Sequence, residues 1–121
     1  MKYLLDTHVF LWWADDDARL SAISRQILAN PDNELLLSAA SVWEISLKIH
    51  AGKIVFDRDF GGVLARMMRV YGIRGLAAGA AHALRTVALP PHHRDPFDRL
   101  LVAQSLLEGL PPITSDPMIR K

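Results

Sequence analysis

The sequence has no cysteine, no long apolar run and no large excess of charge of either sign. Without cysteine there is no disulfide, no thiolate zinc site and no cysteine nucleophile. The longest uncharged apolar run, residues 9–14, is far shorter than the ~20 residues that a membrane-spanning helix needs. An aspartate already stands at position 6, so the start lacks the apolar stretch of a signal peptide. We therefore expect a cytoplasmic protein with no membrane contact.

Composition indicates a folded globular protein, because half of the residues are hydrophobic and 22% are charged. The chain of 121 residues has the length of one domain, and we expect a single domain over residues 1–121. The formal net charge of +1 does not by itself indicate a nucleic-acid-binding protein.

Short apolar runs alternate with helical patterns along the chain. Strands are expected at residues 3–5, 34–38, 73–77 and 112–115. Helices are expected at residues 8–14, 22–29, 41–51, 57–71, 80–89 and 96–108, with Ser21 capping the second. This alternation predicts an α/β fold in which helices cover both faces of a parallel sheet.

Four acidic residues fall at predicted junctions between strands and helices: Asp6, Glu44, Asp98 and Asp116. Because parallel strands end on one edge of a sheet, we expect these carboxylates to converge there. Clustered carboxylates repel one another, and Mg²⁺ or Mn²⁺ would relieve that repulsion with oxygen ligands. Such an ion activates water and stabilises charge on a phosphoryl group, so the pattern indicates phosphodiester hydrolysis.

A helix cap is the alternative role for each acid. Ser41 and Glu44 fit a capping box, and Asp95 and Asp116 each precede a proline, as N-cap residues often do. Asp98 fits this role least well, because it shares a helix face with apolar residues. We therefore predict that Asp95 caps its helix and supports the site, whereas Asp98 belongs to the acidic cluster.

Four segments carry a family resemblance: residues 4–8 (LLDTH), 38–45 (SAASVWEI), 93–101 (HRDPFDRLL) and 114–116 (TSD). In them the sequence resembles the PIN-domain nucleases, in particular the VapC-type toxin ribonucleases of bacterial toxin–antitoxin pairs. The resemblance implies a three-layer PIN-like fold around a mostly parallel sheet. It also implies a Mg²⁺-dependent endoribonuclease, with Mn²⁺ as a possible substitute.

The resemblance also implies roles for individual residues. Asp6, Glu44, Asp98 and Asp116 match the family's catalytic acids. Of these, Asp6 and Asp98 match direct metal ligands, and the other two would act largely through water. Supporting residues are expected at Thr7, Asp95 and Ser115.

Partners are expected on two surfaces. Arg94 and Arg99 flank the acids and are candidates for binding RNA phosphates. Residues 9–13 are five large apolar side chains in little more than one helical turn, so they cannot all point inward. We expect Phe10, Trp12 and Trp13 to bind an antitoxin segment; in the alternative, the following helix and the end of the chain cover both tryptophans. The resemblance further implies a homodimer.

Two other functions and one other kind of metal site are alternatives to a magnesium-dependent toxin. A PIN nuclease in housekeeping RNA processing fits the same residues, and only a neighbouring antitoxin gene would separate the two. A receiver-type signalling module needs an acceptor aspartate after its middle strand, where this chain has Ser and Ala, and a later lysine, which residues 54–120 lack. The five histidines show no zinc-binding spacing, so the pair at positions 92 and 93 is expected in a solvated or RNA-facing loop.

Overall fold

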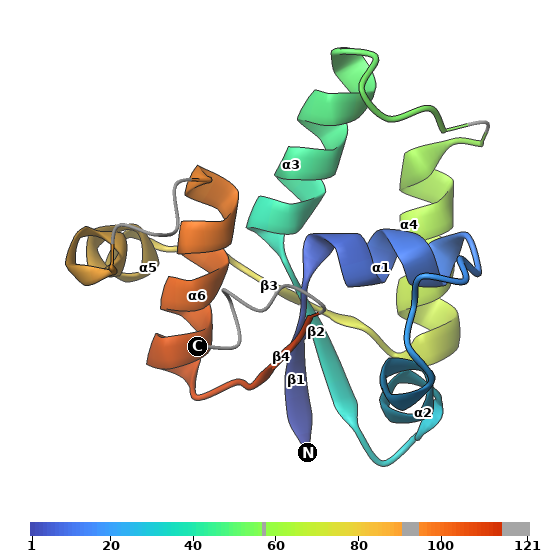
Figure 1. Ribbon diagram of the computed structural model, residues 1–121, viewed down its shortest axis with the longest axis horizontal. Coiled ribbons are helices and arrows are strands. Elements are labelled where there is room, and N and C mark those ends of the chain that lie inside the picture. The colour runs from blue at the N-terminus through green and yellow to red at the C-terminus, as the bar shows by residue number, and fades with distance from the viewer. Residues whose placement is uncertain (57, 91–94, 115–121) are drawn as a thin grey trace.

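The computed structural model describes residues 1–56, 58–90 and 95–114 (Figure 1). Its elements, in chain order, are β1 (Lys2–Leu5), α1 (Thr7–Ala14), α2 (Ala22–Ala29), β2 (Glu34–Ser38), α3 (Ala39–His50), α4 (Phe60–Tyr71), β3 (Arg74–Leu76), α5 (Ala80–Arg85), the 3₁₀ turn η1 (Thr86–Ala88), α6 (Pro96–Glu108) and β4 (Pro112–Ile113). The predicted alternation of strands and helices is confirmed.

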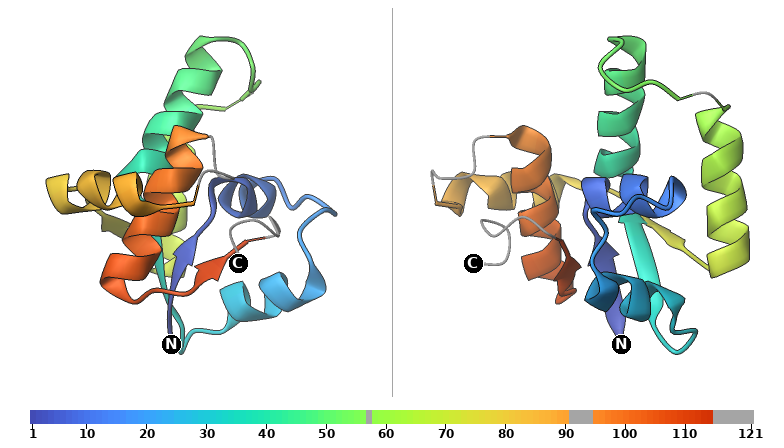
Figure 2. Two further views of the ribbon diagram at one scale, coloured as in Figure 1. Left: turned by 60° about the vertical axis from the view of Figure 1, so that its left-hand side comes forward. Right: turned by 45° about the vertical axis from the view of Figure 1, so that its right-hand side comes forward.

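The four strands form one sheet in the order β3-β2-β1-β4, and every neighbouring pair is parallel. Leu4 of β1 lies opposite Leu36 of β2 and Pro112 of β4, and Leu5 lies opposite Ile113. Helices flank the sheet on both sides (Figure 2), as the three-layer α/β prediction requires. Since the strands run in one direction, β1, β2 and β4 all end at the same edge of the sheet.

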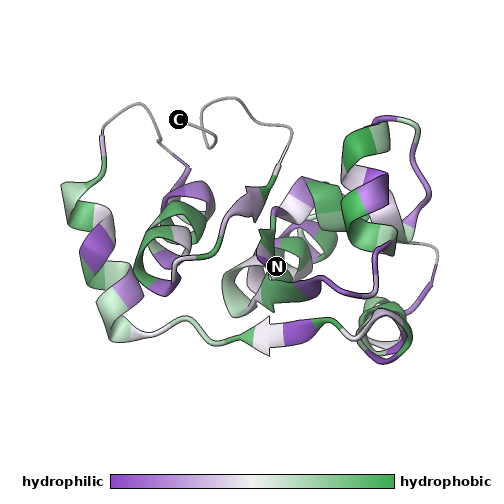
Figure 3. Ribbon diagram, turned by 90° about the horizontal axis from the view of Figure 1, so that it is seen from below, coloured by the Kyte–Doolittle hydropathy of each residue, from purple (hydrophilic) through white to green (hydrophobic). Residues whose placement is uncertain are grey.

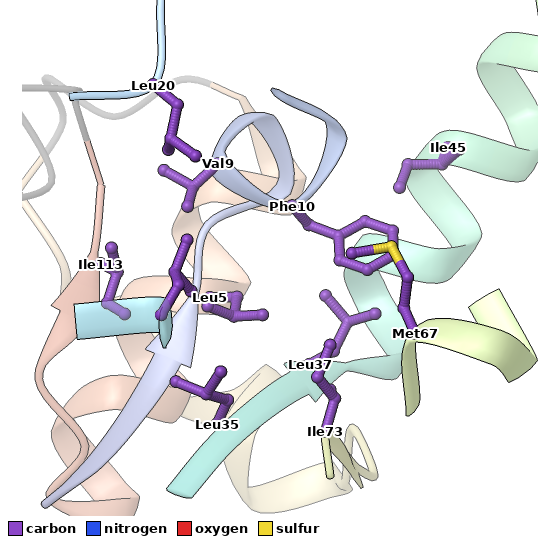
Figure 4. Close-up of a cluster of buried hydrophobic side chains, with 11 residues drawn as sticks. Leu5, Val9, Phe10, Leu20, Leu35, Leu37, Ile45, Met67, Ile73 and Ile113 are labelled. Carbon is purple, nitrogen blue, oxygen red and sulfur yellow. The ribbon is translucent and has the colours of Figure 1, made fainter. Parts of the chain in front are cut away.

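Successive side chains of the strands pack into two separate apolar clusters. On one face, Leu5, Leu35 and Leu37 join residues from the helices on that side, namely Val9, Phe10, Leu28, Ile45 and Met67 (Figure 4). On the other face, Leu4 packs with Leu101 and Leu110. Each fully buried side chain of this size contributes roughly 1.5–3 kcal/mol relative to exposure. The sheet is therefore a well-packed support for the residues at its carboxyl edge.

Hydropathy follows this layering. Figure 3 shows hydrophobic colour along the central strands, while the edge strand β3 also carries hydrophilic residues. No helix in the described part of the chain is both long and apolar enough to cross a lipid bilayer.

The start of α3 differs from the prediction. Strand β2 passes directly into the helix, and Ser38 is its N-cap, with Oγ accepting from the Ala40 backbone N–H at 3.0 Å. The alternative role of Ser41 and Glu44 as a capping box is therefore excluded, and the predicted helix start at Ser41 is wrong. Both residues lie within the helix and both are buried, so the side chain of Glu44 is not used as a cap.

Other boundaries agree more closely or shift for local reasons. Helix α6 has the predicted limits, with Asp95 as N-cap and Gly109 in the left-handed conformation at φ 65°. Helix α4 starts later than predicted, at the residue after its N-cap Asp59. The helix predicted over 80–89 gives way to η1, because Pro90 disfavours helical backbone in the residue before it. β4 ends at Ile113, and Ser115 lies outside the described residues.

Candidate active site

Asp6 follows the last residue of β1 and is the N-cap of α1, with only 4% of its surface exposed. Its backbone N–H donates to the carbonyl of Ile113 at 3.1 Å, which ties it to β4. Burial raises the pKa of Asp6, and the negative charge of Glu44 adds to this rise. Hydrogen bonds from the Thr7 backbone and the Thr114 side chain act in the opposite direction. Asp6 is thus held firmly in surroundings that disfavour its charge.

Glu44 lies in the second turn of α3 and is 2% exposed. Its Oε2 accepts from Nζ of Lys48, one turn further along the helix, at 2.7 Å. The other oxygen, Oε1, is buried and has no hydrogen-bond partner among the residues that the structure describes. A buried carboxylate oxygen without a partner is costly, so a cation that reached Oε1 would be strongly favoured.

A buried hydrogen bond joins the two helices that carry these acids. Thr7 Oγ1, in the first turn of α1, donates to Ser41 Oγ, in the first turn of α3, at 2.9 Å. This hydrogen bond holds the first turn of α1, directly after Asp6, against the first turn of α3, directly before Glu44. Thr7 therefore has a positioning role, through Ser41 rather than through an acid.

The beginning of α6 packs against α3 beside Glu44. Trp43 and Phe97, the neighbours of Glu44 and Asp98 in sequence, meet edge to face at 5.3 Å between ring centroids. Asp95 caps α6, accepting from the backbone N–H of Phe97 at 2.8 Å and of Asp98 at 3.3 Å. The predicted cap at Asp95 is confirmed, and Asp98 lies in the first turn of α6 with a half-buried side chain.

Lys48 links these acids electrostatically. Its hydrogen bond with Glu44 is the largest cause of its raised pKa, partial burial opposes that rise, and the charges of Glu44, Asp95 and Asp98 add to it. Asp6 is coupled to Glu44 in turn. Asp6, Glu44 and Asp98 are thus linked through these pairwise interactions, with Asp98 linked by way of Lys48.

This group is not a complete metal cage. Among the described residues, no three acidic or histidine side chains are close enough to hold an ion unaided. The fourth acid, Asp116, lies outside the described residues, as do Ser115 and Arg94. The available donors are carboxylate oxygens, including the unpartnered Oε1 of Glu44, and this set fits Mg²⁺ or Mn²⁺, which take oxygen ligands and keep several waters.

Comparison with known proteins identifies the family. Residues 3–121 match the PIN domain. The chain belongs to the PIN-domain family. It is also 32% identical to Ribonuclease VapC22 of Mycobacterium tuberculosis, in an alignment that covers 97% of this chain and 88% of that protein. This likeness shows a VapC-type PIN ribonuclease.

Arg99 of this PIN domain is bound to backbone carbonyl groups of the preceding segment. Its guanidinium donates to the backbone carbonyls of Thr86 and of Pro90, the latter at 3.1 Å. These bonds tie α6 to η1 and the segment after it. The expectation that Arg99 binds RNA phosphates stays a prediction, and these carbonyl oxygens show that its guanidinium also has a structural role.

The predicted partner surface on α1 is smaller than expected. Phe10 is 0% exposed, because α1 lies on the sheet and turns this ring toward Met67 in the core (Figure 4). Its assignment to partner binding is wrong. Trp13 is half-buried and packs against Tyr71 with the two rings tilted at 41° and 4.4 Å between their centroids. Trp12 is also half-buried and lines an open cleft of about 440 Å³ together with Lys48.

Two residues of the site were missed in the sequence. Lys48 stands four positions after Glu44, a spacing that places both side chains on one helix face and could have indicated the ion pair. Thr114 follows β4, which pairs with β1, the strand that Asp6 follows. Its place in the TSD segment could have indicated a role for Thr114, but the prediction assigned roles only to Ser115 and Asp116.

Proposed function

We propose that this protein is a metal-dependent endoribonuclease that hydrolyses phosphodiester bonds in RNA. The observation that carries the proposal is the buried pair of Asp6 and Glu44 at the carboxyl edge of the sheet, with one Glu44 oxygen left without a partner. Membership of the PIN-domain family and the likeness to a ribonuclease support the choice of RNA as substrate.

In this proposal Asp6 and Asp98 hold Mg²⁺ directly, and Glu44 and Asp116 act through water molecules. When bound, the ion activates water and neutralises charge that develops on the scissile phosphoryl group. The Thr114 side chain hydrogen-bonds to the Asp6 carboxylate, and the Ile113 carbonyl accepts from the Asp6 backbone N–H and holds the main chain at that position. Ser115 and Arg94 remain proposed as a supporting hydroxyl and a phosphate-binding residue.

The metal requirement is tested on single-stranded RNA. We expect cleavage by the purified chain with Mg²⁺ or Mn²⁺, its loss after exhaustive chelation, and its return when the ion is added back. Either ion should also raise the Tm, because it binds the native state. Undiminished cleavage after chelation would remove the metal from the proposal.

We further propose that the enzyme is the toxin of a toxin–antitoxin pair, acting in the cytoplasm. A segment of the antitoxin would bind the cleft of about 440 Å³ that Trp12 lines. Lys48 lines the same cleft and contacts Glu44, so a bound segment would lie next to the acidic residues. This arrangement supports inhibition by occupation of the substrate path.

A homodimer is proposed as the assembly. Its support is an apolar cleft of about 570 Å³ on α3, α4 and β3, lined by Val42, Trp43, Leu64, Met68 and Leu76. Trp43 is 59% exposed, and exposed apolar patches often mark protein interfaces. Light scattering on the purified chain measures the assembly directly, and a monomer at all concentrations would exclude it.

A further inference from the structure

Lys48 is a cation already present in the acidic site. Its Nζ lies 2.7 Å from Oε2 of Glu44, a carboxylate that is 2% exposed, while its own side chain is 33% exposed. The charges of Asp95 and Asp98 on α6 also act on this ammonium. A single lysine thus faces acids from two helices.

This contact differs from an ordinary surface ion pair. Exposed pairs at this helical spacing contribute little, because water solvates both partners. Glu44 is buried, so without a nearby cation its charge would be poorly compensated. Lys48 supplies that cation, yet it covers one oxygen of Glu44 and leaves Oε1 unpartnered.

A divalent ion that interacts with Glu44 through water, as proposed above, and the ammonium group of Lys48 compete for the same carboxylate charge. They repel each other at a separation of a few ångströms, so both cannot stay close to Glu44 without cost. Lys48 has somewhere to move, since it lines the open cleft of about 440 Å³ together with Trp12 and Lys53. The side chain can therefore leave Glu44 without becoming buried elsewhere.

We propose that Lys48 is a resident counter-ion that a divalent metal displaces from Glu44 when the site loads. Lys48 keeps the metal-free site folded and sets the metal concentration at which the ribonuclease becomes active. It is a positioning residue rather than a metal ligand. The inference rests on the proposed metal-dependent function.

The test is calorimetric titration of the full chain with Mn²⁺, alongside the Tm without metal. Lys48→Met and Lys48→Gln remove the charge, and Lys48→Arg keeps it. Lys53→Met is the matched control, because Lys53 lines the same cleft but has no ion pair within the described residues. We expect both neutral variants to bind Mn²⁺ about tenfold more tightly and to have a lower Tm without metal. Lys48→Arg and Lys53→Met should stay close to the wild type in both measurements.

The results that would contradict the proposal also distinguish a failure of the Lys48 inference from a failure of the metal-dependent function. If the wild type binds Mn²⁺ and both neutral variants bind it equally or more weakly, Lys48 does not compete with the metal and the inference is overturned. If Lys48→Met does not fold, Lys48→Gln decides, since its amide can still donate to Oε2 of Glu44. If the wild type binds no Mn²⁺, the proposed metal-dependent function fails together with the inference.

Discussion

The buried carboxylate of Asp6, which we propose as a metal ligand, lowers the stability of the metal-free protein at neutral pH. Burial raises its pKa above the ordinary value of 3.8, so the native state holds the proton more tightly than the unfolded chain does. The resulting contribution to stability is fully present below pH 3.8 and is lost as the pH rises through the native pKa. At neutral pH, in the absence of metal, the ionised Asp6 therefore destabilises the fold.

Replacing this carboxylate should relieve that cost. Without metal, Asp6→Asn is expected to raise the Tm at pH 7, and the gain should shrink as the pH falls toward 3.8. Thermal denaturation across pH measures both effects. Asp32→Asn, in the exposed turn before β2, is the control and should change the Tm little. A lower Tm for Asp6→Asn at pH 7 would contradict the account.

At the residue scale, the sequence predicted the N-cap of α6 correctly but not the partners of Arg99. Asp95 before Pro96 indicated a cap, and the apolar face of the helix separated Asp98 from it. Arg99 could not be placed in the same way, because its carbonyl partners lie in the segment around η1. Side chains that bond to irregular backbone leave no periodic signal.

Helices α1 and α3 are aligned by one hydrogen bond between their first turns. Thr7→Val removes the hydroxyl and keeps the shape, which leaves Ser41 without its donor at a buried position. We expect a loss of about 1 kcal/mol in the free energy of unfolding. RNA cleavage should fall as well, because Asp6 and Glu44 lose their relative alignment.

Ser46→Ala is the matched control for this change. It removes an exposed hydroxyl on α3 that donates to the Val42 carbonyl at 2.7 Å, away from the interface between the helices. Chemical denaturation and cleavage rates compare the two variants. An equal effect of both, or no effect of Thr7→Val on cleavage, would show that the bond does not align the site.

At the element scale, helix interiors followed from apolar spacing, but the start of α3 did not. A run of small residues after β2 offers three serine or alanine positions for the first turn, and the pattern cannot choose among them. The choice is made by the sheet, because β2 hydrogen-bonds through Ser38 opposite Leu76 and the helix must start immediately afterwards. Because the predicted helix started at Ser41 instead of Ala39, the sequence did not predict that the Glu44 side chain is buried.

The whole molecule brings distant segments to one edge of a parallel sheet. The order of strands and helices predicts such a convergence of acids. Asp6 and Glu44, which are 38 positions apart in the sequence, are both buried and interact electrostatically. The partner surface on α1 could not be predicted in the same way, because the apolar residues of this helix do not indicate which side of it faces the sheet. Trp12 rather than Phe10 reaches the open cleft.

The antitoxin proposal is tested on α1 with two neighbouring tryptophans. Trp12→Ala should weaken binding of the cognate antitoxin about tenfold, as loss of an aromatic interface residue often does. Trp13→Ala should leave affinity nearly unchanged, because Trp13 packs on Tyr71 away from that cleft. Calorimetry with the antitoxin measures both, and the reverse order of effects would move the binding surface toward α4.

The central claim is that Asp98 belongs to the catalytic acids while Asp95 only caps α6. The most direct measurement is the rate of RNA cleavage by Asp98→Asn and Asp95→Asn at saturating Mg²⁺. Asparagine caps a helix as well as aspartate, so Asp95→Asn should keep both fold and activity. Asp98→Asn should lose more than about a hundredfold, since even residues that only support metal ligands cost about 10–100-fold. Full activity in Asp98→Asn together with loss in Asp95→Asn would contradict the account.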